Sequence, residues 1–331
     1  MFESLLAKIN AIIKNPRRLL TYLLHKVGRI FSDTTYLKIF YRIQMGRRLD
    51  LTNPLTYNEK LQWLKLNYRK PEFTKIVDKI YFKEHITNTI GEQYIIPTLG
   101  IWKTFEEIDF DQLPNQFVLK CSHDSGGLFI CRDKKTFNYH RARRIINKHL
   151  KNNHFYFGRE WPYKDIKPRI FAEKYMANKN YDPDININGL KSIDTETLQN
   201  KFGLLDYKFM CFNGDVKALF LDIGVTSKSD GHAEHYYRSI YNTNWEVMDF
   251  KETRDHFPIP IEKPHYFDDM IKIAQKLSAN YPHIRVDLYY INGQIYAGEL
   301  TFFHGSGLDN CFIPNEWDYK FGEWIELPKK L

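Results

Sequence analysis

IRVDLYYINGQIYAGELT, residues 284–301, combines a strong β-hairpin pattern with three charged residues, Arg285, Asp287 and Glu299. It is typical of two β-strands joined at Asn292-Gly293, a dipeptide common in tight hairpin turns. Successive side chains of a strand point to opposite faces, so Arg285 and Asp287 share one face of the first strand. The predicted hairpin therefore presents a cation and a carboxylate side by side.

The register of this hairpin determines whether a second carboxylate, that of Glu299, joins Asp287. A two-residue turn would place Asp287 opposite Gly298 and point Glu299 to the other face of the sheet. A three-residue turn shifts the pairing by one residue and brings the two carboxylates to one face. We predict the three-residue turn, with Gly293 in the left-handed conformation that glycine adopts easily.

Two carboxylates without histidine or cysteine suit a hard cation such as Mg²⁺, which proteins usually hold through one or two carboxylates and substrate phosphates. Arg285 would then stand beside a transferred phosphoryl group and neutralise its charge. The alternative is an ordinary edge hairpin with a surface ion pair. The hairpin by itself leaves both interpretations open.

Lys120 lies in an apolar strand predicted over 117–122, and a Gly-rich turn follows it. A charged side chain in such a strand is costly unless it has a partner. The turn, His123-Asp124-Ser125-Gly126-Gly127, offers backbone N–H groups and the Ser125 hydroxyl to phosphate oxygens. It lacks the G-x-x-x-x-G-K-[ST] pattern of a P-loop, so a plain hairpin is the alternative.

Three further ionisable residues fall on predicted strands. Asp206 and Lys208 share one face of the strand that begins near residue 205, and Glu173 lies in RIFAEKYM, residues 169–176. Each pattern also fits a solvent-facing residue near the start of a strand. The histidines lack the spacing of a metal site, and no G-x-S-x-G or G-x-G-x-x-G motif is present.

The composition bounds the class of protein. Of the 331 residues, 43% are apolar and 27% are charged, which excludes a disordered chain and a membrane-spanning bundle. The net charge is +8, and residues 1–50 contribute +7 of it, since ten Lys and Arg there face three acidic residues. Nucleic-acid proteins usually spread basic charge over the main fold, so we expect no nucleic-acid partner.

The basic segment 1–50 is predicted to form amphipathic helices, because apolar residues recur every three or four positions on both sides of Pro16. Residues 1–31 fit helices lying in the plane of an anionic membrane surface, and they fit equally well helices packed on the protein's own core. The four cysteines lack a disulfide or zinc spacing. Free thiols and the absence of an apolar signal segment favour the cytoplasm.

The remaining pattern predicts an α+β fold. Thr56 and Glu59 form a capping box that begins a helix, and a second helix is predicted from about residue 73 to residue 90. We also expect helices at 139–152 and 268–280, strands at 117–122, 128–131, 169–176, 205–212 and 216–225, and a polar loop at 177–204.

Taken in order, these pieces resemble an ATP-grasp enzyme and, more narrowly, the TupA-like ATP-grasp family of bacterial polysaccharide biosynthesis. The resemblance spans about residues 40–328 and rests on TYNEKLQWLK, IPTLGIW, LPNQFVLKCSHDSGG, REWPYKDIKPRIFAEKYM, LDYKFMCFNGD, RVDLYYINGQIYAGELTFF and WIELP. It implies an ATP-grasp fold in which two α+β lobes clasp ATP. The implied segments are a helical region at 51–115, a small lobe at 116–176, a polar insertion loop at 177–204 and a large lobe with the metal site at 205–331.

The resemblance also implies a role for each candidate residue. For ATP it implies contacts from Lys120, Ser125, Gly126, Gly127, Glu173, Tyr175, Met176 and Asp206. It implies Mg²⁺ bound by Asp287, Glu299 and Thr301, catalysis by Arg285 and Lys208, and an acceptor pocket bordered by His304, Gly305, Ser306 and Gly307. The wider superfamily usually has Asn at the position of Thr301, so a neutral hydroxyl replaces one expected metal ligand.

The implied reaction is ATP-dependent ligation of a carboxylate to an amine through an acylphosphate, with release of ADP. The expected carboxylate is a uronic acid of a surface polysaccharide or its lipid-linked precursor, and the expected amine is an amino acid or a small amine. Basic helices would suit work at the inner face of the cytoplasmic membrane. The competing hypotheses are a glycosyltransferase of capsule or O-antigen synthesis, with Asp182-Pro183-Asp184 as its metal motif, and a non-catalytic glycan-binding protein.

Overall fold

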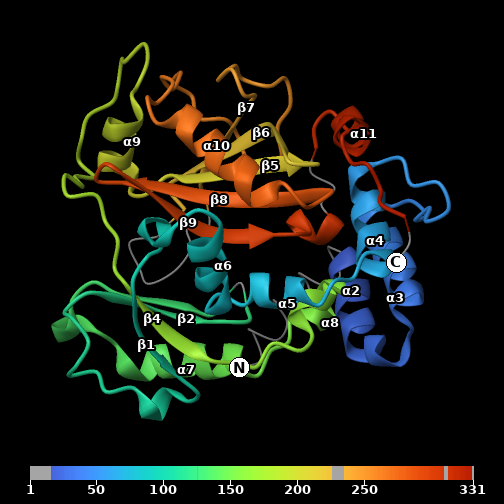
Figure 1. Cartoon of the computed structure of the whole chain (residues 1–331), viewed down its shortest axis with the longest axis horizontal. Helices are drawn as coiled ribbons and strands as arrows, with labels where there is room; N and C mark the ends of the chain where they lie inside the picture. Colours follow the sequence, from blue (N-terminus) through green and yellow to red (C-terminus); the bar gives the residue numbers. More distant parts are fainter. Residues whose placement is uncertain (1–15, 125, 226–234, 309–311, 330–331) are drawn as a thin grey trace.

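Two antiparallel sheets stand one above the other in the computed structural model of the chain (Figure 1). The structure describes residues 16–124, 126–225, 235–308 and 312–329. The larger sheet has the strand order β7-β6-β5-β8-β9, and the smaller sheet has the order β1-β4-β2-β3. Helices cover both sheets, so the predicted α+β class is confirmed.

The large sheet separates an apolar side from a charged side. Its strands are β5 (Asp206–Phe212), β6 (Asp215–Ile223), β7 (Tyr237–Tyr241), β8 (His283–Ile291) and β9 (Gln294–Thr301). On one face, α10 (Phe267–Ser278) buries an apolar stripe against the sheet, and Phe267 stacks on Phe209 of β5. The opposite face carries Lys208, Arg285 and Asp287, which alternate with the core residues along their strands.

The small sheet consists of β1 (Thr98–Trp102), β2 (Phe117–Cys121), β3 (Leu128–Cys131) and β4 (Ile170–Lys174). The amphipathic helix α7 (Tyr139–Leu150) covers its outer face, away from the large sheet (Figure 1). Because β1 pairs with β4, this sheet begins at Thr98, outside the 116–176 segment implied for the small lobe.

Three short helices precede β1 along the chain: α4 (Tyr57–Asn67), α5 (Glu72–Val77) and α6 (Tyr81–Thr89). The capping box of Thr56 and Glu59 at the start of α4 is confirmed. The single helix predicted over 73–90 is wrong, since α5 ends before Asp78 and a separate helix, α6, follows. The Asp78 carboxylate accepts the N–H of Ile80 at 3.0 Å and binds Arg169 at 2.8 Å, which favours a turn over a continuous helix.

The predicted loop at 177–204 contains a helix, α9 (Thr195–Phe202). Asp194 caps this helix by accepting the N–H of Thr197 at 2.8 Å. Among the described residues, the remaining α-helices are α2 (Pro16–Val27), α3 (Asp33–Met45), α8 (Phe155–Gly158) and α11 (Glu316–Glu323).

Helices α2 and α3 pack together at one end of the molecule (Figure 1). Their shared core contains Tyr36, Leu37 and Phe40 of α3, whereas α2 contributes the buried Leu24. The helix predicted before Pro16 lies outside the described residues. Over the part of the chain that the structure describes, the helices are too short or too polar to cross a bilayer.

Candidate active site

Asp287 and Glu299 lie directly opposite each other on β8 and β9. The predicted three-residue turn is wrong, because Ile291 pairs with Gln294 and leaves a two-residue turn. A register shift instead falls beyond Asp287, where Leu288 pairs with Ala297. The extra residue of this β-bulge, Gly298, moves Glu299 to the face of Asp287.

The bulge explains why position 298 is a glycine. A Cβ there would stand 2.7 Å from the Tyr289 ring and 3.2 Å from the Asp287 carbonyl oxygen. Both neighbours belong to β8, so a side chain would push the two strands apart. The carboxylates therefore share one face, as predicted, although a bulge and not the turn sets the register.

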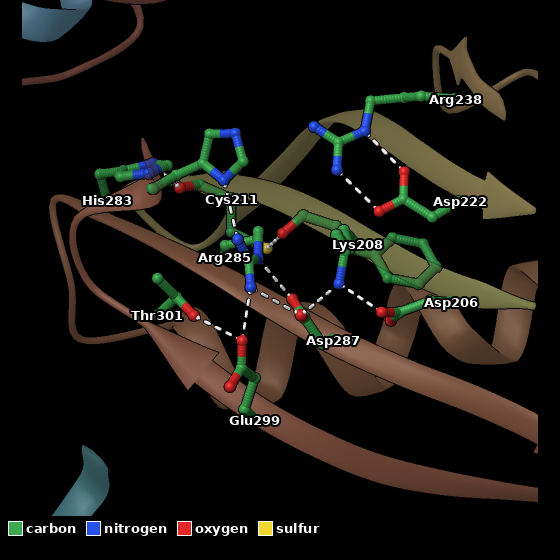
Figure 2. A network of polar contacts seen from close by, with 12 residues as sticks. Asp206, Lys208, Cys211, Asp222, Arg238, His283, Arg285, Asp287, Glu299 and Thr301 are labelled. Atoms are coloured by element: carbon green, nitrogen blue, oxygen red, sulfur yellow. Dashed lines mark hydrogen bonds and ion pairs between the residues drawn. The ribbon is translucent and has the colours of Figure 1, made fainter. Parts of the chain in front are cut away.

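Arg285 joins the two carboxylates (Figure 2). Its Nε and Nη2 donate to the two oxygens of Asp287 at 2.6 and 2.7 Å, and Nη2 also donates to Glu299 Oε1 at 2.6 Å. The Thr301 hydroxyl donates to the same Glu299 oxygen at 3.2 Å. The residues predicted for the metal and for the phosphoryl group are thus in mutual contact.

Lys208 continues this charged row onto β5. Its ammonium lies 2.8 Å from Asp287 and also bonds Asp206 Oδ2, as Figure 2 shows. The second oxygen of Asp206, Oδ1, is buried and has no hydrogen-bond partner among the described residues. We call Asp206, Lys208, Arg285, Asp287, Glu299 and Thr301 the charged belt.

Burial and mutual charge shift the pKa values in this belt in opposite directions. Burial raises the pKa of Asp206 to about 6, although Lys208 opposes the shift. Glu299 also loses solvation, but Arg285, Lys79 and Lys208 outweigh that and lower its pKa to about 2. Carboxylates keep the pKa of Lys208 above its ordinary value despite burial. Glu299 is therefore ionised at neutral pH, whereas Asp206 titrates at a pH close to neutral.

The small sheet presents lysines to the same region. Lys120 of β2 binds Glu173 of β4 at 2.6 Å, and Lys83 of α6 binds the other oxygen of Glu173 at 2.7 Å. Glu173 is thus the charged partner that Lys120 needs in an otherwise apolar strand. Lys83 could not be assigned a role from the sequence, because a single lysine in an amphipathic helix carries no recognisable motif.

Lys79 links the two lobes electrostatically. Its positive charge lies near Glu299 of the large sheet and near Lys120 and Asp124 of the small one. The Lys79 ammonium also donates to the backbone carbonyl of Asp124, at the start of the Gly-rich turn. Asp124 further binds His149 of α7 at 2.5 Å, so both neighbours anchor the turn.

The described part of this turn is closely packed. A Cβ at Gly127 would stand 2.6 Å from Cys121 Sγ, and one at Gly126 would stand 2.7 Å from the His149 ring. The backbone of the turn can therefore approach β2 and α7 only because both positions lack a side chain. Ser125, predicted as a phosphate contact, lies outside the described residues.

Tyr175 and Met176, predicted to contact ATP, are half-buried directly after β4. The segment that follows is tied to the large sheet by the hairpin turn. The Asn292 amide donates to the Ala177 carbonyl at 3.1 Å and accepts the Lys179 N–H at 3.2 Å.

The loop after β9 holds the four residues predicted for the acceptor. Gly305, Ser306 and Gly307 have φ angles of 56°, 56° and 55°, a left-handed run that is rare for Ser306. Lys65 of α4 donates to the Ser306 carbonyl at 2.7 Å and to its hydroxyl at 3.0 Å. Gln62 donates to the Gly307 carbonyl at 2.5 Å. Helix α4 thus fixes a strained loop.

The donor set fits Mg²⁺ better than a transition metal. Over the described residues, no three His, Cys, Asp or Glu side chains gather as a transition-metal site held by protein ligands would require. Two carboxylates and one hydroxyl, as in Asp287, Glu299 and Thr301, suit a hard cation that completes its shell with phosphate and water. The ion would compete with Arg285 for both carboxylates.

The alternative metal motif lies elsewhere. Asp182 and Asp184 are exposed in a turn where the Asp184 N–H donates to Asp182 Oδ1 at 2.9 Å. The side chain of Asp182 thus stabilises its own turn, as aspartates in loops commonly do. This geometry favours the structural interpretation of the D-x-D motif.

Two facing antiparallel sheets with helices, together with the charged belt, define an ATP-grasp enzyme. The model of the TupA-like ATPgrasp family matches residues 59–192 and 187–326. The chain therefore belongs to the TupA-like ATP-grasp family, which confirms the predicted family, and with it the predicted class of an ATP-dependent ligase. No curated protein matches the chain.

The chain is also similar, at low identity, to solved structures. D-cycloserine synthetase DcsG is 12% identical over 76% of this chain and 70% of that one, with a TM-score of 0.40. D-alanine-D-alanine ligase from Helicobacter pylori is 13% identical over 82% and 69%, with a TM-score of 0.38. The biotin carboxylase domain of Hydrogenobacter thermophilus 2-oxoglutarate carboxylase, in complex with MgADP, is 14% identical over 77% and 47%, with a TM-score of 0.39.

Proposed function

We propose that the chain is an ATP-dependent carboxylate–amine ligase that works through an acylphosphate. The observation that carries the proposal is the Arg285 guanidinium, which joins Asp287 and Glu299 at 2.6–2.7 Å on a sheet that faces the lysines of the other lobe. Paired carboxylates beside an arginine suit a triphosphate with its metal ion. The expected cofactors are ATP and Mg²⁺.

Each charged side chain then has a chemical task. Asp287, Glu299 and Thr301 would hold Mg²⁺, which supplies positive charge that offsets the charge of the phosphates. Lys120 and Lys83, aligned by Glu173, would bind the phosphates from the small lobe. The unpartnered Oδ1 of Asp206 would accept a hydrogen bond from a ribose hydroxyl.

The proposed reaction has two chemical steps, phosphoryl transfer and ligation. A substrate carboxylate oxygen attacks the γ-phosphorus, the bond to the β–γ bridging oxygen breaks, and ADP leaves. The amine nitrogen then attacks the acyl carbon, phosphate leaves with the electrons of the carbon–oxygen bond, and the amine loses one proton. Arg285 would stabilise the negative charge that develops in both steps.

We further propose a uronic acid of a surface polysaccharide, or of its lipid-linked precursor, as the carboxylate, and an amino acid or small amine as the second substrate. The family supports a glycan substrate, and a surface of α2 supports a membrane-bound one. Leu20, Leu23 and Val27 are 49%, 50% and 50% exposed on one face of α2, beside the exposed Lys26 and Arg29. An apolar stripe flanked by cations suits an anionic lipid surface.

One assay tests the reaction. The purified chain is incubated with ATP, Mg²⁺, a uronic-acid glycan and an amino-acid mixture, and ADP and amide products are measured. We expect ADP release that requires both the glycan and the amine. Turnover of a nucleotide sugar without ADP would instead establish the glycosyltransferase alternative, and neither activity would favour the glycan-binding one.

A further inference from the structure

Arg285 has a third partner besides the two carboxylates. Its Nη1 lies 2.8 Å from Nδ1 of His304, in the loop after β9. A guanidinium only donates hydrogen bonds, so Nδ1 of His304 must accept with its lone pair. The ring proton of neutral His304 is therefore on Nε2, which lies 3.2 Å from Glu252 Oε1 and donates to it.

The contacts continue from Glu252 across the large sheet. Glu252 Oε2 bonds Arg238 of β7, and Arg238 in turn makes two bonds, of 2.6 and 2.7 Å, with Asp222 of β6. The side chains of Glu252 and Asp222 are each 1% exposed. Arg254 also lies 3.8 Å from Glu252 Oε2, so two guanidinium groups face the two carboxylates, and the other oxygen of Glu252 lies beside His304.

The neighbouring charges determine which of these linked side chains are ionised. Burial disfavours ionised Glu252, but Arg238 and His304 overcome that and hold its pKa well below the ordinary range. Carboxylates keep the pKa of Arg238 raised despite burial. Glu252 therefore accepts hydrogen bonds at any physiological pH, and it fixes which nitrogen of His304 carries the proton.

We propose that His304 and Glu252 are positioning residues that orient Arg285 for the phosphoryl-transfer and ligation steps; this rests on the proposed function. His304 holds Nη1, which leaves Nε and Nη2 to face Asp287 and Glu299. With both ring nitrogens engaged and 4% of its surface exposed, His304 acts through Arg285 rather than by touching the acceptor.

Protonation of His304 would break this arrangement. The groups that face the ring are Arg285 and His283 of β8, Glu252, and the Phe220 ring of β6 at 5.6 Å. Burial lowers the pKa of His283 to about 3, so His283 stays neutral. A proton on Nδ1 would remove the acceptor for Nη1 and place two cations in contact. The orientation of Arg285 therefore depends on a neutral His304 ring.

Two substitutions separate this role from a structural one. In His304→Asn the amide oxygen can occupy the position of Nδ1 and accept from Arg285 without titrating, whereas His304→Leu removes the acceptor. We expect His304→Leu to lower kcat by about 10- to 100-fold, as loss of an orienting partner typically does. KM for ATP should change less than about threefold, because the phosphate lysines are untouched.

His304→Asn should recover at least part of the kcat that His304→Leu loses. Glu252→Gln should lower kcat, because Gln can donate to Nε2 and favour the wrong tautomer. His85→Asn, on α6 and outside these contacts, is the matched control and should behave as wild type. Wild-type kcat in His304→Leu, or no recovery of kcat in His304→Asn, would overturn the proposal.

A measurement without turnover separates this proposal from the proposed function. Nitrogen-15 NMR of the histidine rings in the unliganded chain, assigned by comparison with His304→Asn, reports which ring nitrogen carries the proton. We expect Nε2 of His304 to be protonated and Nδ1 to be unprotonated at neutral pH. The opposite tautomer, or a doubly protonated ring, would overturn the positioning role even if ligase activity were found. The expected tautomer in a chain without ligase activity would overturn only the proposed function.

Discussion

Asp287 and Glu299 face each other across β8 and β9 because the bulge at Gly298 adds one residue between them and the two-residue turn. Alternation along a strand would otherwise separate the two carboxylates by the thickness of the sheet. The belt therefore depends on a backbone irregularity as much as on its charged side chains.

Gly298→Ala tests that dependence. The new methyl group would overlap the Tyr289 ring and the Asp287 carbonyl, so we expect a loss of about 1–3 kcal/mol in stability and a sharp drop in ADP formation. Urea denaturation and the ADP assay measure both. Gly293→Asn is the control, because the space around Gly293 is open and Asn tolerates its positive φ. Equal effects from both variants would contradict a specific role of the bulge at Gly298 in placing Glu299.

Glu299→Gln tests the metal assignment. The side chain of Glu299 is 39% exposed, against 2% for Asp287, so its loss should disturb the fold less. We expect ADP formation to fall to background at ordinary Mg²⁺ and to recover only in part at high Mg²⁺. Asp287→Asn should also abolish ADP formation, with an added loss of stability because Arg285 and Lys208 lose a partner. Wild-type rates in either variant would refute the assignment; the exposed Asp215→Asn serves as control.

Glu173→Gln tests whether that carboxylate aligns the lysines. Removing its charge leaves Lys83 and Lys120 to repel each other, so we expect ATP to bind about tenfold more weakly. Lys83→Met and Lys120→Met should each weaken ATP binding as well. Calorimetric titration with ATP gives the dissociation constants, and the exposed Lys217→Met is the control. Unchanged affinity in Glu173→Gln would show that the lysines need no alignment.

Stability should depend on pH through two belt residues with opposite signs. The pKa of Asp206 is raised from 3.8 to about 6, so the folded state binds the proton more tightly and loses stability as pH rises through that interval. The pKa of Glu299 is lowered from 4.5 to about 2, so its contribution is present above about pH 4.5 and is lost as pH falls towards 2.

Urea midpoints measured from pH 3 to pH 8 test both signs. Relative to wild type, Asp206→Asn should gain stability between about pH 4 and pH 6, where the wild-type carboxyl ionises. Glu299→Gln should be less stable than wild type above about pH 4.5, with the difference shrinking in acid. A parallel pH dependence in all three proteins would contradict the assigned shifts.

The exposed face of α2 makes a prediction about membranes. Replacing Leu20, Leu23 and Val27 together by serine should weaken sedimentation of the full chain with anionic liposomes, because each apolar side chain loses its burial in the interface. Binding should also weaken with added salt, since the flanking cations act electrostatically. Neutral liposomes are the control. Unchanged sedimentation of the triple variant would contradict membrane binding through this face of α2.

The sequence predicted which residues form the charged belt better than it predicted the backbone geometry that brings them together. Alternation along a strand was enough to group Arg285 with Asp287 and Asp206 with Lys208, because a period of two needs no knowledge of distant residues. The bulge was missed, since an isolated glycine in a strand fits a turn-adjacent position as well as a bulge. The need of Lys120 for a partner was visible, but the identity of Glu173 required the pairing of β2 with β4.

Contacts between residues that lie far apart along the chain could not be predicted from the sequence. Glu252 meets His304 across 52 positions and Lys65 meets Ser306 across 241, and these separations correspond to no local period or motif. The break after α5 was likewise missed, because the cause is a contact between Asp78 and the distant Arg169. Family resemblance supplied the expected class, whereas burial and partners came from the structure.

ADP release should be compared between wild type and Glu299→Gln, each with and without the glycan carboxylate and the amine. We expect Mg²⁺-dependent release by wild type that requires both substrates, and background release by Glu299→Gln. ADP release by wild type in the absence of either substrate, or undiminished release by Glu299→Gln, would refute the proposed ligase reaction at this site.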